Sequence, residues 1–158
     1  MSKWSVVAVR VLVVLAFLVV LFFQAALVPM VAEQSARTFP AVAFLQVPGI
    51  IGSVALLACV QVVLVCIWRL VDLVAAGRIF DARAFVWVDT IIAALWVATG
   101  LIVIGAVILN LTGATAPGLF YPIIVGVIFG AGAALVVGIM RRLLHQATEL
   151  RGELDEVV

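Results

Sequence analysis

Four charged side chains lie within or beside long apolar runs, where ionic chemistry is unusual. They are Arg10, Arg69, Asp72 and Asp89. Guanidinium and carboxylate groups in such surroundings are costly, so they normally face a protein interior and pair. Two interpretations stay open. One is a structural clasp that fixes helix register, and we favour it. The other is a site for an ion, a proton or an anionic headgroup.

Helical spacing predicts which of these charges meet. Asp89 lies eight residues after Asp81, and Arg69 lies eight residues before Gly77. Each offset corresponds to about 12 Å along a helix, so two antiparallel helices would hold the two residues at similar depth. We therefore expect Arg69–Asp89 as the main ion pair, with Arg10 and Asp72 nearby.

The segment from Gly77 to Phe85 has the residues of a capped helical hairpin. Gly77 can end a helix in a left-handed conformation. Asp81 can accept hydrogen bonds from the first turn of the next helix. Phe80 and Phe85 then occupy the positions of a hydrophobic staple. This pattern indicates a tight turn between two helices and needs no functional explanation.

The sequence contains no recognisable catalytic motif. It has no H-E-x-x-H, G-x-S-x-G or P-loop pattern, and no Cys/His cluster with zinc spacing. Cys59 and Cys66 are seven residues apart, which is about 10 Å along a helix and too far for a disulfide. His145 is the single histidine. We expect a non-enzyme without cofactor or metal.

Composition decides the class of protein. The 158 residues are 68% hydrophobic and 11% charged, with a mean hydropathy of +1.43. A soluble domain of this size cannot bury so much apolar surface. The net charge of +1 provides no basic field for nucleic acid. The chain is expected to be an integral membrane protein whose first partner is the lipid bilayer.

Apolar runs of about 20 residues can cross a bilayer as helices. Four such spans are expected, at about 4–28, 48–74, 82–109 and 119–140. The first is longer than the apolar part of a signal peptide and lacks a clear cleavage site, so we expect it to be retained. Pro48 suits the first position of the second span, and "TFPAVAFLQVP" before it suits a short interfacial helix.

Lysine and arginine in short loops set the orientation of a membrane protein. With both termini inside, the outside holds only Arg37 and the inside holds Lys3, Arg10, Arg69, Arg78, Arg83, Arg141, Arg142 and Arg151. We predict an all-α four-helix bundle in a bacterial cytoplasmic membrane, N-in and C-in, with a short cytoplasmic C-terminal helix. Residues 1–147 form its transmembrane domain, and residues 148–158 form an acidic tail.

Two stripes predict packing surfaces. Small residues recur every fourth position on the fourth span, at Gly126, Gly130, Ala134 and Gly138. They allow a close approach by another helix, either in the same bundle or in a second copy. In the tail, apolar residues follow a coiled-coil spacing that could lie on the membrane or dock a partner: Leu143, Ala147, Leu150, Leu154 and Val157.

Several segments resemble the bacterial DUF2975 membrane proteins over nearly the whole length. They are the opening "MSKWSVVAVRVL", "FPAVAFLQVPG", "ACVQVVLVCIWRL", the Gly77 and Phe80 spacing, and the closing "ELRGELDEVV". The resemblance implies a small four-span protein of uncharacterised function. It also implies a membrane partner for a cytoplasmic helix-turn-helix regulator, which the residues alone do not indicate.

Three functions remain open. The first is a non-catalytic signalling or scaffold protein that docks a partner through its cytoplasmic hairpin and tail. The second is a small transporter, or a membrane protein that binds a lipid or small molecule, using the Arg/Asp layer near the cytoplasmic side. The third is an auxiliary subunit, or one copy of a homo-oligomer, held through the small-residue stripe.

Overall fold

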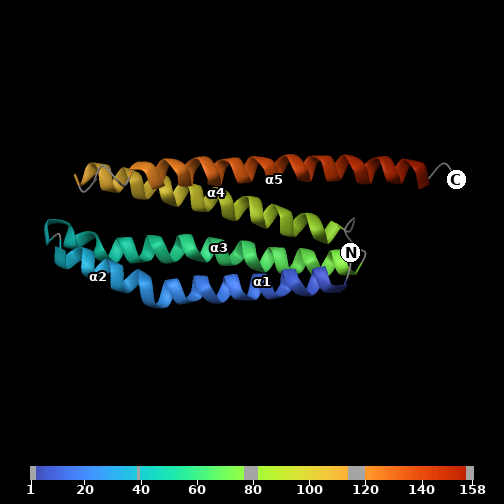
Figure 1. The fold of residues 1–158 in the computed structure, drawn as a ribbon. Helices are drawn as coiled ribbons and strands as arrows, with labels where there is room; N and C mark the ends of the chain where they lie inside the picture. The colour runs from blue at the N-terminus through green and yellow to red at the C-terminus, as the bar shows by residue number, and fades with distance from the viewer. Residues whose placement is uncertain (1–2, 39, 77–81, 114–119, 156–158) are drawn as a thin grey trace.

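The computed structural model describes residues 3–38, 40–76, 82–113 and 120–155, and these are helical except at short turns (Figure 1). Four of the helices are long and apolar enough to cross a membrane. The expectation of an all-α membrane protein with four apolar helices is therefore confirmed. No strand occurs in the described ranges, because a chain in lipid must satisfy its backbone hydrogen bonds within each segment.

The first span does not end at Pro29. α1 (Lys3–Phe22) continues through the π-helical turn η1 (Phe23–Leu27) into α2 (Val28–Thr38). Proline has no N–H, and its ring crowds the carbonyl four residues earlier. A π-helical turn immediately before Pro29 widens the helix at that point and relieves the crowding. The rod therefore extends ten residues beyond the predicted end at 28.

The segment before the second span is a 3₁₀ helix, η2 (Pro40–Leu45), which runs directly into α3 (Gln46–Ala75). Pro48 is the third residue of α3 rather than the first. The position still suits proline, because backbone N–H groups in a first helical turn have no intrahelical partner. The third and fourth spans are α4 (Ala82–Leu111) and α5 (Phe120–Asp155).

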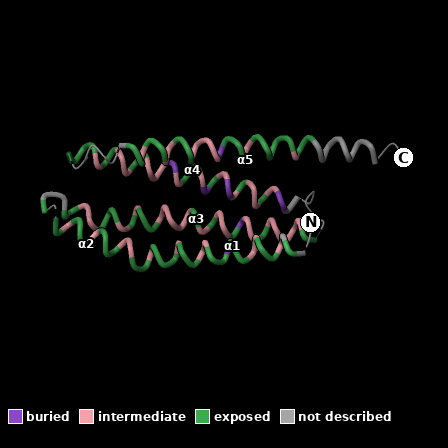
Figure 2. The backbone as a smooth tube through the Cα atoms, viewed as in Figure 1, coloured by how far each residue is buried: buried purple, intermediate pink, exposed green. Residues whose placement is uncertain are grey.

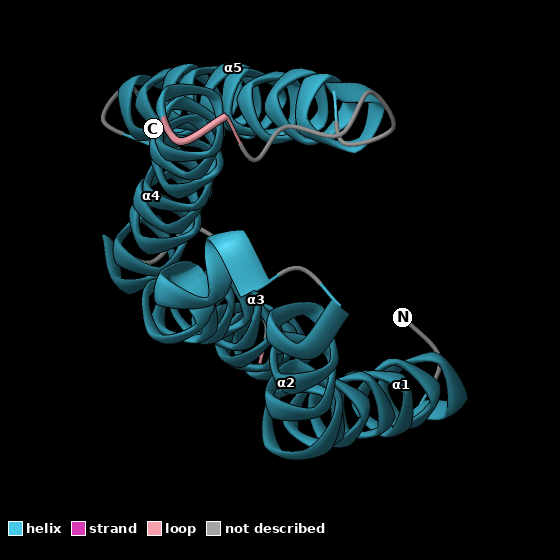
Figure 3. Ribbon diagram, turned by 90° about the vertical axis from the view of Figure 1, so that its left-hand side faces the viewer, coloured by secondary structure: helices cyan, strands magenta, loops and turns pink. Residues whose placement is uncertain are grey.

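The four long helices form an open row. α1 packs on α3, α3 on α4, and α4 on α5, while α2 also packs on α3. Within the described ranges, no contact joins α1 to α4 or α5, or α3 to α5. Viewed along the helices, the row curves into an arc with one open side (Figure 3). Each long helix is antiparallel to the next, and both chain ends lie at the same end of the row (Figure 1).

Few described residues are buried, and those few line the contacts between neighbouring helices (Figure 2). They are mostly small: Val13, Cys66, Ala84, Ile91, Ala94, Thr99 and Ala134. Lipid tails are as apolar as leucine, so helices gain little by burying large side chains against each other. Small residues instead allow close backbone approach, and the large apolar side chains remain on the outer surface.

The small-residue stripe of α5 faces α4 over part of its length. A methyl group at Gly126 would lie 3.1 Å from Cδ1 of Ile102, and one at Gly130 would overlap Oγ1 of Thr99. Ala134 is 2% exposed. A methyl group at Gly138 would meet nothing within 4 Å. The α4 and α5 axes are therefore close near Gly130 and further apart toward Gly138, as their slant in Figure 1 shows.

Replacing Gly130 with alanine should loosen the α4–α5 contact. Overpacking of a close contact costs about 1–3 kcal/mol of unfolding free energy. Gly132→Ala is the matched control, because a methyl group there meets nothing within 4 Å. Adding Thr99→Ala to Gly130→Ala should recover most of the loss. Equilibrium unfolding in mixed detergent micelles measures all four proteins, and equal stability of the two alanine variants would contradict the close contact.

The N-in, C-in orientation can be tested with single cysteines at exposed positions on opposite ends of the row. Ser35 lies on α2 and Gln146 lies on α5. In intact cells, a membrane-impermeant maleimide should label Ser35→Cys and leave Gln146→Cys unlabelled until the cells are opened. The wild-type chain controls for Cys59 and Cys66. The reverse labelling pattern would mean the opposite orientation.

Candidate functional site

Arg10 of α1 is held by two side chains of α3. Its Nη2 donates to Oδ1 of Asp72 at 2.6 Å. Its guanidinium carbon lies 5.7 Å from the centre of the Trp68 ring, within the usual range of a cation–π contact. Trp68 and Asp72 are four residues apart on α3, so they lie on the same face. The α1–α3 contact therefore has a polar clasp about one helical turn long.

The Arg10 clasp is not fully satisfied. Its Nε atom is buried and has no acceptor among the described residues. A buried donor without a partner costs about 1–3 kcal/mol. The Arg10 and Asp72 side chains are 41% and 36% exposed, so both are only partly buried between the helices. This arrangement positions α1, but it leaves part of the arginine's donor capacity unused.

Asp89 of α4 pairs with Arg141 of α5. The two oxygens of Asp89 accept from both Nε and Nη2 of Arg141, at 2.5 Å and 2.8 Å. Such two-point pairs fix geometry as well as charge. One turn away, the rings of Phe85 and His145 meet edge to face, with centres 5.7 Å apart. Long side chains thus bridge α4 and α5 beyond Gly138, where the helix axes have separated.

The predicted Arg69–Asp89 pair is wrong. Arg69 lies over the ring of Trp87, with 5.8 Å between the guanidinium carbon and the ring centre. Trp87 faces α3, and Asp89 is two residues further along α4. Two residues correspond to about 200° of helical rotation, so the two side chains project from nearly opposite sides. Arg69 lies close to the depth of Asp89, but Asp89 projects from the face of α4 that meets α5.

The partner of Asp89 could have been found from the outer connection instead. Asp89 lies 22 residues before the end of α4, and Arg141 lies 21 residues after the start of α5. Equal offsets from one connection bring two antiparallel residues level. The loop-charge count places Arg141 only on the cytoplasmic side. The spacing from the outer connection is the signal in the sequence that identifies it as the partner of Asp89.

The hairpin prediction falls largely outside the described residues, which exclude Gly77, Phe80 and Asp81. α3 ends at Ala75 with Ala76 as its C-cap, and α4 begins at Ala82. Phe85 contacts His145. This ring contact gives His145, the single histidine, a packing role between α4 and α5.

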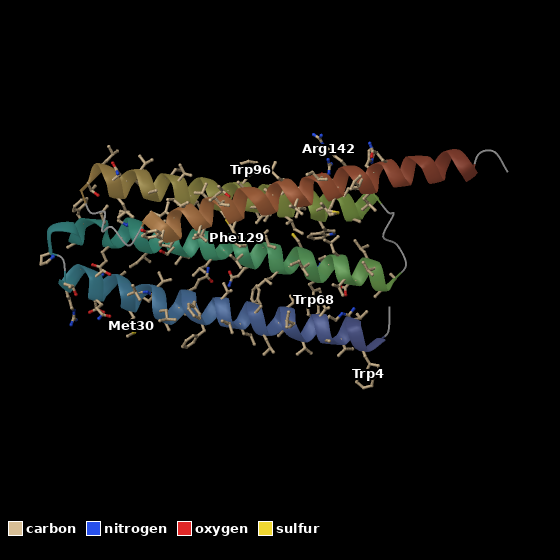
Figure 4. The ribbon with its side chains drawn as sticks, turned by 45° about the horizontal axis from the view of Figure 1, so that its top comes forward. Trp4, Met30, Trp68, Trp96, Phe129 and Arg142 are labelled. Carbon is tan, nitrogen blue, oxygen red and sulfur yellow. The ribbon has the colours of Figure 1, made fainter. Side chains whose placement is uncertain are left out.

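The charged residues do not form a single layer around one cavity. Arg10 and Asp72 clasp α1 to α3, Asp89 and Arg141 clasp α4 to α5, and Arg69 lies between them at the α3–α4 contact. No group of three potential metal ligands occurs among the described residues. Figure 4 shows Trp68 and Arg142 toward the end of the row that carries these charges.

A family model supports the resemblance noted in the sequence. The model for DUF2975, described as a protein of unknown function, matches residues 30–158. The chain belongs to the DUF2975 family. No curated protein and no solved structure matches it. The DUF2975 match includes Arg69, Asp72, Asp89 and Arg141, whereas Arg10 and the quoted opening segment precede it. The family description supplies no activity, so function rests on the geometry.

The pairing can be tested by double-mutant cycles on unfolding free energy in detergent. Asp89→Asn and Arg141→Gln should show a coupling of about 0.5–1 kcal/mol, the usual size for half-exposed or membrane polar pairs. Asp89→Asn and Arg69→Gln should be additive within about 0.3–0.5 kcal/mol, because the two side chains share no contact. A larger coupling of Asp89 with Arg69 than with Arg141 would support the Arg69–Asp89 pair instead.

Proposed function

We propose that this chain is a non-catalytic protein of the bacterial cytoplasmic membrane that docks a partner protein at its cytoplasmic face. The observation that carries the proposal is the length of α5. Its apolar part ends at Met140, yet the helix continues for 15 residues to Asp155, which is about 22 Å. The end of α5 projects beyond every other helix of the row (Figure 1).

An isolated helical extension of this length is marginal in water. Its sequence carries the apolar stripe from Leu143 to Leu154, and Leu143 is 54% exposed. A helix with one apolar stripe commonly docks in a groove of another protein. The last eleven residues hold four acidic side chains and one arginine, so the expected partner surface is an apolar groove with a basic rim.

The two ion pairs favour a rigid base for this extension over a transport path. Both carboxylates of the charged set already accept from an arginine, and the two ion pairs lie at separate helix contacts. A proton or ion relay needs groups linked along one route. The transport alternative therefore has less support than a rigid scaffold.

A role as a subunit of a larger complex is a second candidate, and the open row favours it. α1 and α5 form the two edges, and each contacts only one long helix in the described ranges. Trp4 is 85% exposed on α1, and Phe129 is 75% exposed on α5 (Figure 4). A partner that spans the membrane could cover either edge.

The docking proposal predicts that the apolar stripe of the extension is required. Leu150→Asp with Leu154→Asp should abolish most in-cell photocrosslinking from a probe at Gln146 to a cytoplasmic protein. A chain ending at Gln146 should do the same while retaining Arg141 and His145. Thr148→Asp is the matched control, because it adds a carboxylate to the same turns outside the stripe and keeps all four acidic side chains.

Unchanged crosslinking in the stripe variant would contradict docking through the extension. Crosslinks that form only from probes at Trp4 or Phe129, and not from the probe at Gln146, would instead favour the subunit role. Those two positions lie on the membrane-spanning edges.

A further inference from the structure

The groove between α1 and α3 has apolar walls and one charged residue. Its volume is about 390 Å³. The Arg10–Asp72 pair sets the antiparallel register, which places Arg69 level with Val13 and Leu64 level with Leu18. The groove thus runs along the helices from Arg69 toward the membrane interior. Its lining includes Val13 and Leu18 of α1 with Leu64, Val65, Trp68 and Arg69 of α3.

Arg69 is the charged residue of the groove, and neither clasp neutralises it. Arg10 and Arg141 are each neutralised by an aspartate. Arg69 makes no ion pair with any side chain that the structure describes. Its guanidinium group lies over the face of the Trp87 ring. Stacking on an aromatic ring occupies the face of a guanidinium and leaves its in-plane N–H donors available. Those donors match the geometry of a phosphate.

We propose that this groove binds an acidic phospholipid, with an acyl chain against the apolar wall and the headgroup phosphate on Arg69. Arg69 lies six residues before the end of α3, which is about 9 Å inward. A long arginine side chain there can extend toward the headgroup level. Basic pockets between spanning helices are a recognised way to hold anionic headgroups.

The charges favour a lipid over a second copy of this chain. A second copy would have to offer Arg69 a free carboxylate at membrane depth. The described carboxylates are Glu33, Asp72 and Asp89, and each is paired with an arginine of its own chain. A membrane lipid brings both an apolar chain and an unpaired negative charge, so it complements the whole groove.

Native mass spectrometry of the detergent-solubilised chain, titrated with dioleoyl phosphatidylglycerol or dioleoyl phosphatidylcholine, tests the proposal. The wild-type chain should retain one phosphatidylglycerol about fivefold more strongly than phosphatidylcholine, the ratio expected for one arginine–headgroup contact. Arg69→Gln should reduce this ratio to about one, and Arg69→Lys should keep most of it. Arg142→Gln is the control, because Arg142 is exposed on α5 and outside the groove.

A second pair of variants tests the apolar wall. Val65→Trp should fill the groove and weaken retention of both lipids. Val60→Trp should not, because Val60 is similarly exposed on the same helix, at 41% against 45%, but does not line the groove.

Equal retention of the two lipids by the wild-type chain would overturn the proposal, whether or not the variants fold. An equal loss of preference in Arg69→Gln and Arg142→Gln would also overturn it, because the preference would then come from overall surface charge. Displacement of phosphatidylglycerol by millimolar inorganic phosphate would show an anion site that needs no acyl chain, contrary to the proposed occupant.

Discussion

The absence of a hydrophobic driving force between helices in lipid is the constraint on which this structure depends. Each span satisfies its own backbone, so the choice of neighbour rests on close backbone approach and on polar contacts between helices. The buried set contains no side chain larger than Ile91. An open row of helices is stable under these conditions, because an uncovered apolar face costs little where lipid can cover it. In water the same arc would have to close.

The α4–α5 contact uses close backbone approach in one part and polar or aromatic side chains in another. Near Gly126 and Gly130 the helices meet through small residues. Past Gly138 their axes have separated, and Arg141–Asp89 together with His145–Phe85 span the wider gap. Arg10 and Asp72 join α1 to α3 at the same end of the row. At the α4–α5 contact, charged and aromatic side chains therefore occur where small residues no longer suffice, so the Asp89–Arg141 pair has a packing role.

The sequence predicted the parts of the fold that depend on one-dimensional patterns. Apolar length predicted the four long helices. Depth also followed from counting residues. The face of the helix on which a residue lies could not be predicted in this way. An error of two residues along a helix reverses the side from which a side chain projects. Trp87 and Asp89 differ by that amount, so counting residues alone predicts the wrong partner for Arg69. The first span is predicted to end at 28, before Pro29, but a π-helical turn accommodates this proline within a continuous rod.

The last contacts of α5 decide what its extension can do. Arg141–Asp89 and His145–Phe85 hold α5 to α4 immediately before the helix leaves the row. A two-point pair and an edge-to-face ring contact one turn apart restrict both the tilt and the rotation of the helix beyond them. The apolar stripe of the extension would then face one fixed direction relative to the membrane. A docking surface gains affinity when it is ordered before binding, so the charged residues can serve a partner without touching it.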